Sequence, residues 1–104
     1  MKRDPETVRC VIRAENNKDS RLLAVFYNNP GRNDPRTMEF YSQGEGHGWV
    51  DDTYLRNRTR KPTPEEKERM TERLRFIGYA PIVKDRIPSS AFSNRIRALK
   101  RTGK

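Results

Sequence analysis

Two arginine-rich segments carry the residue types best suited to binding chemistry. The first runs from Arg56 to Lys61 (RNRTRK), and the second runs from Arg86 to Lys104 and holds six basic residues and no acid. The guanidinium group of arginine is a planar fork that pairs with phosphate or carboxylate through two hydrogen bonds. Each phosphate that such a group neutralises adds salt-dependent affinity. These segments predict a binding surface for nucleic acid or for a nucleic-acid-binding host protein.

We expect basic side chains from both segments to contact the partner. They are Arg56, Arg58, Arg60 and Lys61, followed by Arg95, Arg97, Lys100 and Arg101. Trp49, Tyr54 and Tyr79 lie near the segments in sequence, and their rings are of the kind that stacks on bases. For Trp49 we favour a place in the core, because a small core needs its large ring.

The only histidine lies among acidic residues, which are Glu45, Asp51 and Asp52. A histidine beside a glycine-rich bend can act as a general base, and paired carboxylates can bind a divalent cation. The spacing matches no established nucleophile or metal motif, so a metal-dependent enzyme around His47 is the weakest of our hypotheses. We interpret His47 as a loop residue and the two aspartates as caps of a following helical turn. The sequence therefore predicts no catalytic residue, no metal site and no cofactor.

The composition predicts one small domain with a thin hydrophobic core and many charged residues. The chain has 104 residues, of which 32% are hydrophobic and 36% charged, whereas typical domains are about 45–50% apolar and about 25% charged. The net charge is +9, and it is uneven: residues 1–50 hold 8 Lys/Arg and 7 Asp/Glu, and residues 51–104 hold 15 and 7. A positive field of this size attracts phosphate polyanions or acidic protein surfaces.

Several classes of protein are disfavoured by what the sequence lacks. Cys10 is the only cysteine, so no intrachain disulfide can form, which suits a reducing compartment. One cysteine and one histidine cannot build a zinc site within one chain. No apolar run approaches the roughly 18–20 residues that cross a bilayer, and the first residues lack the apolar stretch of a signal peptide. We expect a cytoplasmic protein with no membrane partner and with Cys10 in its core.

The first half of the chain reads as three strands. Residues 7–14 alternate between apolar and polar, which indicates a strand, and residues 21–27 are apolar on both faces, which is typical of a central strand. The turn formers between them predict a hairpin. Residues 28–36 predict a loop, and residues 37–42 predict a third strand. The glycine-rich bend that follows leads into residues 49–55, which fit either a helical turn or a short strand.

The clearest element is a helix over residues 64–77. Thr63 caps it, Pro64 suits its first position, and Glu66 completes a capping box. Its apolar stripe is Met70, Leu74 and Ile77, and Gly78 ends it. Residues 79–85 predict a fourth strand, which Pro81 places near a sheet edge or a strand start. A last helix, begun by Ser89 or Ser90, carries an apolar stripe of Phe92, Ile96 and Leu99.

These elements predict an α+β fold. We expect a small antiparallel sheet in the order β-β-β-α-β, with one helix packed on one face. The sheet and its helix make a single domain over residues 1–88. A basic C-terminal helix or tail occupies residues 89–104.

Several motifs resemble those of small uncharacterised accessory proteins carried by bacteriophages and other mobile elements. The matching residues span roughly 8–86 and are Val11-Ile12-Arg13, Leu23-Ala24-Val25-Phe26, Gly46-His47-Gly48, Thr59-Arg60-Lys61-Pro62-Thr63-Pro64-Glu65-Glu66, Ile77-Gly78-Tyr79 and Ile82-Val83-Lys84. The chain departs from that pattern in its basic tail after Pro88 and in a longer middle bend. The resemblance assigns no residue roles. It implies an accessory protein of a bacterial cytoplasm that assists nucleic-acid handling or acts against host defence.

Two functions follow from these patterns. The first is a non-enzymatic accessory protein that binds DNA, RNA or a ribonucleoprotein through a basic surface. The alternative is an inhibitor that docks on a host immunity protein, as an anti-CRISPR does. Both require the basic segments to meet in one exposed surface.

Overall fold

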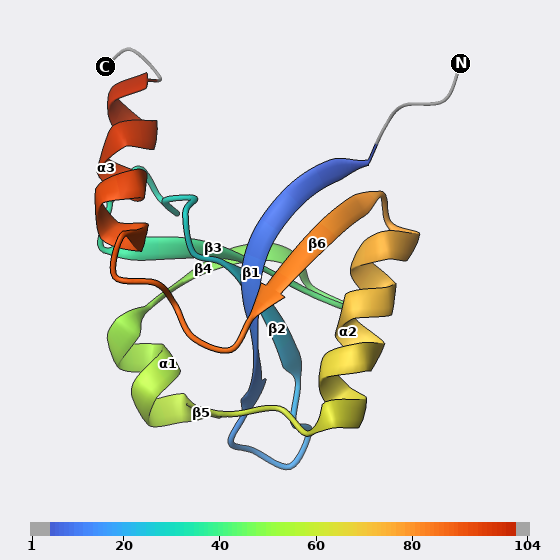
Figure 1. The fold of residues 1–104 in the computed structure, drawn as a ribbon. Helices are drawn as coiled ribbons and strands as arrows, with labels where there is room; N and C mark the ends of the chain where they lie inside the picture. Colours follow the sequence, from blue (N-terminus) through green and yellow to red (C-terminus); the bar gives the residue numbers. More distant parts are fainter. Residues whose placement is uncertain (1–4, 102–104) are drawn as a thin grey trace.

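The computed structural model describes residues 5–101, which form six strands and three helices (Figure 1). The strands are β1 (Glu6–Glu15), β2 (Leu22–Phe26), β3 (Thr37–Ser42), β4 (Gly46–Asp51), β5 (Thr59–Arg60) and β6 (Tyr79–Lys84). The helices are α1 (Asp52–Arg58), α2 (Pro64–Phe76) and α3 (Ala91–Arg101). The α+β class predicted from the sequence is confirmed. None of these helices is long and apolar enough to cross a membrane.

The sheet is built around β1, its longest strand. β4, β3, β2 and β1 follow one another as antiparallel neighbours. The predicted β1–β2 hairpin and the central position of β2 are therefore confirmed. The other edge of β1 pairs in parallel with β6 along residues 6–11 and in antiparallel with β5 at residues 14 and 15.

The sheet departs from the predicted strand order in two ways. The chain adds β4, α1 and the short β5 between the third strand and α2, and β6 runs parallel to β1 rather than antiparallel. The direction of β6 follows from α2, which carries the chain back to the start of β1, where Tyr79 pairs with Glu6. Within residues 5–101 β6 pairs only with β1, which confirms the edge position expected from Pro81.

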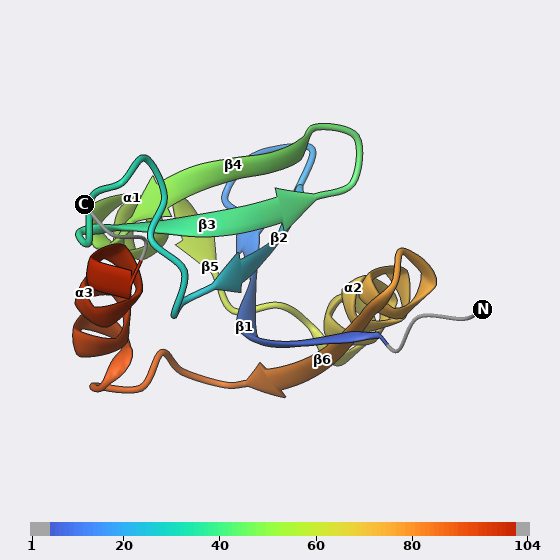
Figure 2. The same ribbon diagram turned by 90° about the horizontal axis from the view of Figure 1, so that it is seen from above.

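Both faces of the sheet carry a core, because the middle of β1 is apolar on both sides. One face, which includes Cys10 and Ile12, packs against Leu74 of α2. The predicted packing of this helix on one face is confirmed. The other face, which includes Val11, packs in a second cluster with Leu55 of α1, and α3 joins that cluster at its first residue. Figure 2 shows α2 and α3 at opposite ends of the molecule.

The start of α2 has the predicted capping box. The Glu66 backbone N–H donates to Thr63 Oγ1 at 3.2 Å, and the Thr63 N–H donates to Glu66 Oε1 at 2.8 Å. Gly78 follows the helix with a φ of +109°, a left-handed conformation that glycine adopts without steric cost. Ile77 is exposed at the end of the helix and does not extend its buried stripe.

β4 leads directly into α1, so residues 49–55 are partly strand and partly helix. Asp51 caps α1 by accepting a hydrogen bond from the Tyr54 N–H at 2.8 Å, as the sequence predicts. The prediction that His47 lies in a loop is wrong, because β4 already begins at Gly46. Residues 43–45 form the turn between β3 and β4, in which Gly44 has a left-handed φ of +103°. His47 follows this turn and pairs with Tyr41 within the sheet.

The prediction that Trp49 lies in the core is also wrong. Successive side chains of a strand point to opposite faces, and in β4 it is Val50 that enters the core. Trp49 is consequently 45% exposed. The guanidinium of Arg32 lies 4.7 Å from the centre of its ring, a distance at which cation and ring attract each other.

A buried arginine attaches α3 to the rest of the fold. Arg95 is 4% exposed, and its guanidinium donates hydrogen bonds to the carbonyl oxygens of Tyr27 at 2.6 Å and Pro35 at 2.7 Å. Burial lowers the pKa of Arg95, although an arginine side chain stays charged in proteins. Because α3 turns Ala91 and Arg95 inward, the predicted apolar stripe is not its buried face, and Phe92 is 46% exposed.

Loss of the Arg95 guanidinium should destabilise the fold. In Arg95→Met the carbonyls of Tyr27 and Pro35 lose their donors, and an unsatisfied buried polar group costs about 1–3 kcal/mol. We expect the free energy of unfolding, measured by urea denaturation, to fall by about 2–4 kcal/mol. The matched control is Arg97→Met, whose exposed side chain should matter by less than about 0.5 kcal/mol. Equal destabilisation in the two variants would contradict the structural role of Arg95.

Candidate functional site

A break in one edge of the sheet defines the candidate site. Along this edge of β1, pairing with β6 ends at Val11 and pairing with β5 begins at Ala14. Residues 12 and 13 therefore lie opposite a gap between two strands laid end to end. β6 reaches the gap at Lys84, and the chain leaving β5 reaches it from the other direction at Lys61. The topology thus brings together basic residues that are far apart in the sequence.

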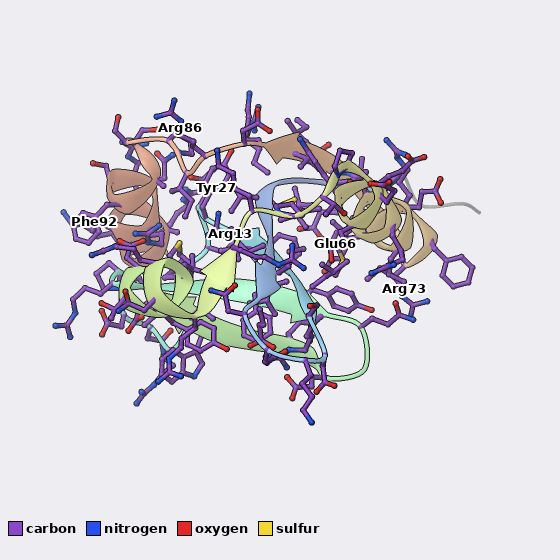
Figure 3. The ribbon with its side chains drawn as sticks, turned by 90° about the horizontal axis from the view of Figure 1, so that it is seen from below. Arg13, Tyr27, Glu66, Arg73, Arg86 and Phe92 are labelled. Atoms are coloured by element: carbon purple, nitrogen blue, oxygen red, sulfur yellow. The ribbon has the colours of Figure 1, made fainter. Side chains whose placement is uncertain are left out.

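We call the concave surface around this gap the basic groove. It consists of two adjoining hollows of about 430 and 460 Å³ that share Lys61, Asp85 and Arg86. Figure 3 shows Arg13 in the middle of the molecule, between α1 and α2, and Arg86 on the segment that follows β6. The charged residues that line the groove are Arg13, Arg56, Lys61, Lys67, Lys84, Arg86, Asp52 and Asp85.

Most cations of the groove form no close ion pair within residues 5–101. Lys67 is the exception, because its Nζ lies 2.9 Å from Asp85 Oδ1, and this contact lowers the pKa of Asp85. Among the residues that line the groove, the exposed cations that take part in none of the ion pairs formed within residues 5–101 are Arg56, Lys61, Lys84 and Arg86. Asp52 and Asp85 are the two carboxylates that offset the six basic residues of the groove, and Asp85 also attracts Lys61 and Arg86. The groove therefore presents an excess of positive charge.

Arg13 is the most buried of the groove's arginines. Its Nε donates to Thr59 Oγ1 at 2.9 Å and its Nη2 donates to the Thr59 carbonyl oxygen at 3.2 Å. Both acceptors are neutral, and no ion pair within residues 5–101 involves Arg13. Partial burial lowers the pKa of Arg13, because loss of water disfavours the charged form. An anion in the groove would meet a guanidinium that is already oriented and partly desolvated.

Only some of the basic residues predicted in the first arginine-rich segment line the groove. Arg56 and Lys61 line the groove, whereas Arg58 lines a separate hollow. Arg60 is held by the protein itself: its Nη1 and Nη2 lie 2.8 and 3.0 Å from the two carboxylate oxygens of Glu66. The structure therefore brings two of the four predicted side chains into the groove.

The second predicted segment reaches the groove only at its start. Arg86 lines both hollows, whereas Arg97, Lys100 and Arg101 line neither. Figure 1 shows α3 running away from α1 toward its C-terminal end. The guanidinium of Arg95 is buried and hydrogen-bonded to main-chain carbonyls, so it is not accessible to a partner. The two arginine-rich segments therefore meet at the groove through Arg86.

Sequence reasoning missed Arg13, Lys67 and Lys84 as groove residues. Each reads in the sequence as the polar position of an amphipathic element, and none belongs to a charge cluster. The available signal for Arg13 is its place inside a strand two residues after Val11, on the same face as that buried side chain. A charge at such a position needs a partner or an opening to water.

The residues of the enzyme hypothesis have separate partners. His47 Nδ1 lies 4.0 Å from Glu39 Oε2, Glu45 pairs with Arg21, and Asp51 caps α1. In the part of the chain that the structure describes, no group of three or more His, Cys, Asp or Glu side chains is placed to hold a metal ion. These residues therefore do not assemble into one centre.

Comparisons of the chain with protein-family models, with curated proteins and with solved structures find no significant match. The resemblance to accessory proteins of mobile elements stays a prediction from the sequence. What the groove binds has to be inferred from its own charges and geometry.

The Arg60–Glu66 pair predicts a loss of stability in acid. Hydrogen bonds from Arg60 and from the Thr63 N–H lower the pKa of Glu66 from its ordinary value of 4.5 to about 2. Such a carboxylate stabilises the folded state above its unfolded pKa, and this contribution is lost as the pH falls through its folded pKa. We expect the free energy of unfolding to fall between about pH 4.5 and about pH 2.

Denaturant titrations at a series of pH values measure this effect. Glu66→Gln cannot titrate at this position, so its stability profile should be flatter in the same pH window. Glu65→Gln, in the same helical turn, is the control and should keep the slope of the unchanged protein. Parallel profiles for Glu66→Gln and the unchanged protein would contradict the role of the pair.

Proposed function

We propose that the protein binds the phosphate backbone of nucleic acid in the basic groove and acts through this binding rather than through catalysis. The observation that carries the proposal is Arg13, a partly desolvated cation bonded only to neutral acceptors. It lies where exposed cations from two distant segments meet. Charges of one sign in a concave site focus the electric field and attract polyanions.

A phosphate backbone fits the groove better than a single acidic side chain. Because the cations lie on both sides of the gap, several anions in a row would neutralise more of them than a single anion would. The guanidinium groups of Arg13, Arg56 and Arg86 suit paired phosphate oxygens, and Lys61 and Lys84 act as point charges. A nucleic-acid strand supplies anions at regular intervals along its length.

The proposed setting is the cytoplasm of a bacterial cell. It comes from the resemblance to accessory proteins of bacteriophages and mobile elements, and it is compatible with the net charge of +9. There the partner would be DNA, RNA or a ribonucleoprotein. A non-enzymatic protein of this kind would act by occupying or covering a strand.

The salt dependence of binding tests the groove directly. If each of the five cations other than Lys67 neutralises one phosphate, the log–log slope of affinity against salt should be about −3.5 to −4.5. Lys61→Gln and Arg86→Gln should each reduce the magnitude of this slope by about 0.7–0.9. Fluorescence anisotropy of a labelled oligonucleotide at several salt concentrations measures both quantities.

Lys100→Gln is the matched control, because it removes the same charge from the outer part of α3. It should leave the slope unchanged. A reduction as large as that of Lys61→Gln would show that net charge, rather than the groove, drives binding. Absence of nucleic-acid binding at low salt, together with nuclease-resistant capture of one host protein, would replace the proposal with the anti-CRISPR-like alternative.

A further inference from the structure

A second concave site lies across α1 from the basic groove. Tyr54 and Arg58 of α1 line this site, whereas Leu55 and Arg56 line the groove. It has a volume of about 570 Å³, within the range of small-molecule sites. We call it the aromatic hollow, because Phe40, Trp49 and Tyr54 contribute to its walls together with Arg21 and Arg58.

The walls of the aromatic hollow are held in place by a buried carboxylate. Glu15 is buried, and its two oxygens accept hydrogen bonds from Arg21 Nε at 2.8 Å and Arg21 Nη2 at 2.9 Å. The Tyr54 hydroxyl donates to the same carboxylate. One side chain therefore fixes both a ring and a guanidinium of the hollow. Fixed walls reduce the entropy lost when a ligand binds.

The aromatic rings of the hollow differ in how far they are exposed to a ligand. Phe40 is only 7% exposed, and it packs closely on Gly48, where an added Cβ would come within 2.7 Å of Phe40 Cζ. Trp49 on the same edge strand is half-exposed. Trp49 and Tyr54 therefore offer planar groups beside the cation of Arg58. Flat rings beside cations are what a nucleobase and its phosphate require.

We propose that the aromatic hollow receives an unpaired nucleobase from the strand whose phosphates lie in the basic groove. This inference rests on the proposed function and sharpens it, because it makes the protein selective for single-stranded nucleic acid. A strand that crosses α1 would meet Arg56 on one side and Arg58 on the other. Asn57, which also lines the hollow, offers an amide to the edge of the base. The bases of a duplex are stacked and paired, so they cannot enter.

Tryptophan fluorescence gives a direct readout, because Trp49 is the only tryptophan and lines the hollow. The full chain is titrated with a single-stranded oligonucleotide of DNA or RNA, with the matching duplex and with an abasic strand of equal length. We expect a single strand to quench Trp49 and to bind about tenfold more tightly than the abasic strand, as one stacked base allows. The abasic strand and the duplex should not quench Trp49.

Two substitutions separate the hollow from the groove. Tyr54→Leu removes a ring and should weaken single-strand binding about tenfold, while binding of the duplex and of the abasic strand stays unchanged. Tyr54→Phe keeps the ring and should retain most of the single-strand preference. Unchanged duplex binding also shows that the Tyr54→Leu protein is folded.

The outcomes distinguish a failure of this inference from a failure of the proposed function. Equal affinity for single and abasic strands without Trp49 quenching overturns the nucleobase site and leaves phosphate binding in place. Equal weakening of all three probes by Tyr54→Leu also overturns it. Failure of every probe to bind at low salt overturns phosphate binding and the nucleobase site together.

Discussion

The rest of the structure depends on β1, which is buried on both faces and paired along both edges. Its apolar positions face two cores, so helices must cover both sides of the sheet. One edge pairs with β2, and the two short strands β5 and β6 share the other. Two strands laid end to end along one edge leave a gap, and Arg13 lies opposite it. The basic groove is thus a by-product of how β1 is paired.

Arg13 and Arg95 show how surroundings give one residue type two different roles. Both lose water, both have a lowered pKa for that reason, and both donate hydrogen bonds to neutral acceptors. Arg95 is buried, and its guanidinium donates hydrogen bonds to main-chain carbonyls, so it attaches α3 to the rest of the fold. Arg13 lines the groove beside the exposed cations Arg56, Lys61 and Arg86, and its guanidinium has further donors that Thr59 does not use.

The features that were predictable from the sequence are those whose partners are close in the sequence. The Thr63–Glu66 capping box joins residues three positions apart, and the Asp51 cap and the β1–β2 hairpin are equally local. Trp49, the buried Arg95 and the direction of β6 depend on distant partners, and the carbonyls that hold Arg95 are 60 and 68 positions away. Charge clustering found Arg56 and Lys61 in the groove. It missed Arg13, because the opening beside that residue is formed by segments that follow β5 and β6.

The parallel pairing of β1 with β6 has a consequence for the order of events during synthesis. Glu6 leaves the ribosome long before Tyr79, its neighbour in the sheet, and contacts so distant in sequence form slowly. Until β6 docks, residues 6–11 of β1 lack a partner on that edge, and residues 13 and 86 do not yet line one hollow. A nascent chain that lacks β6 therefore carries much of the positive charge without the concave surface, and the groove forms only after residues 79–86 have been made and β6 has docked.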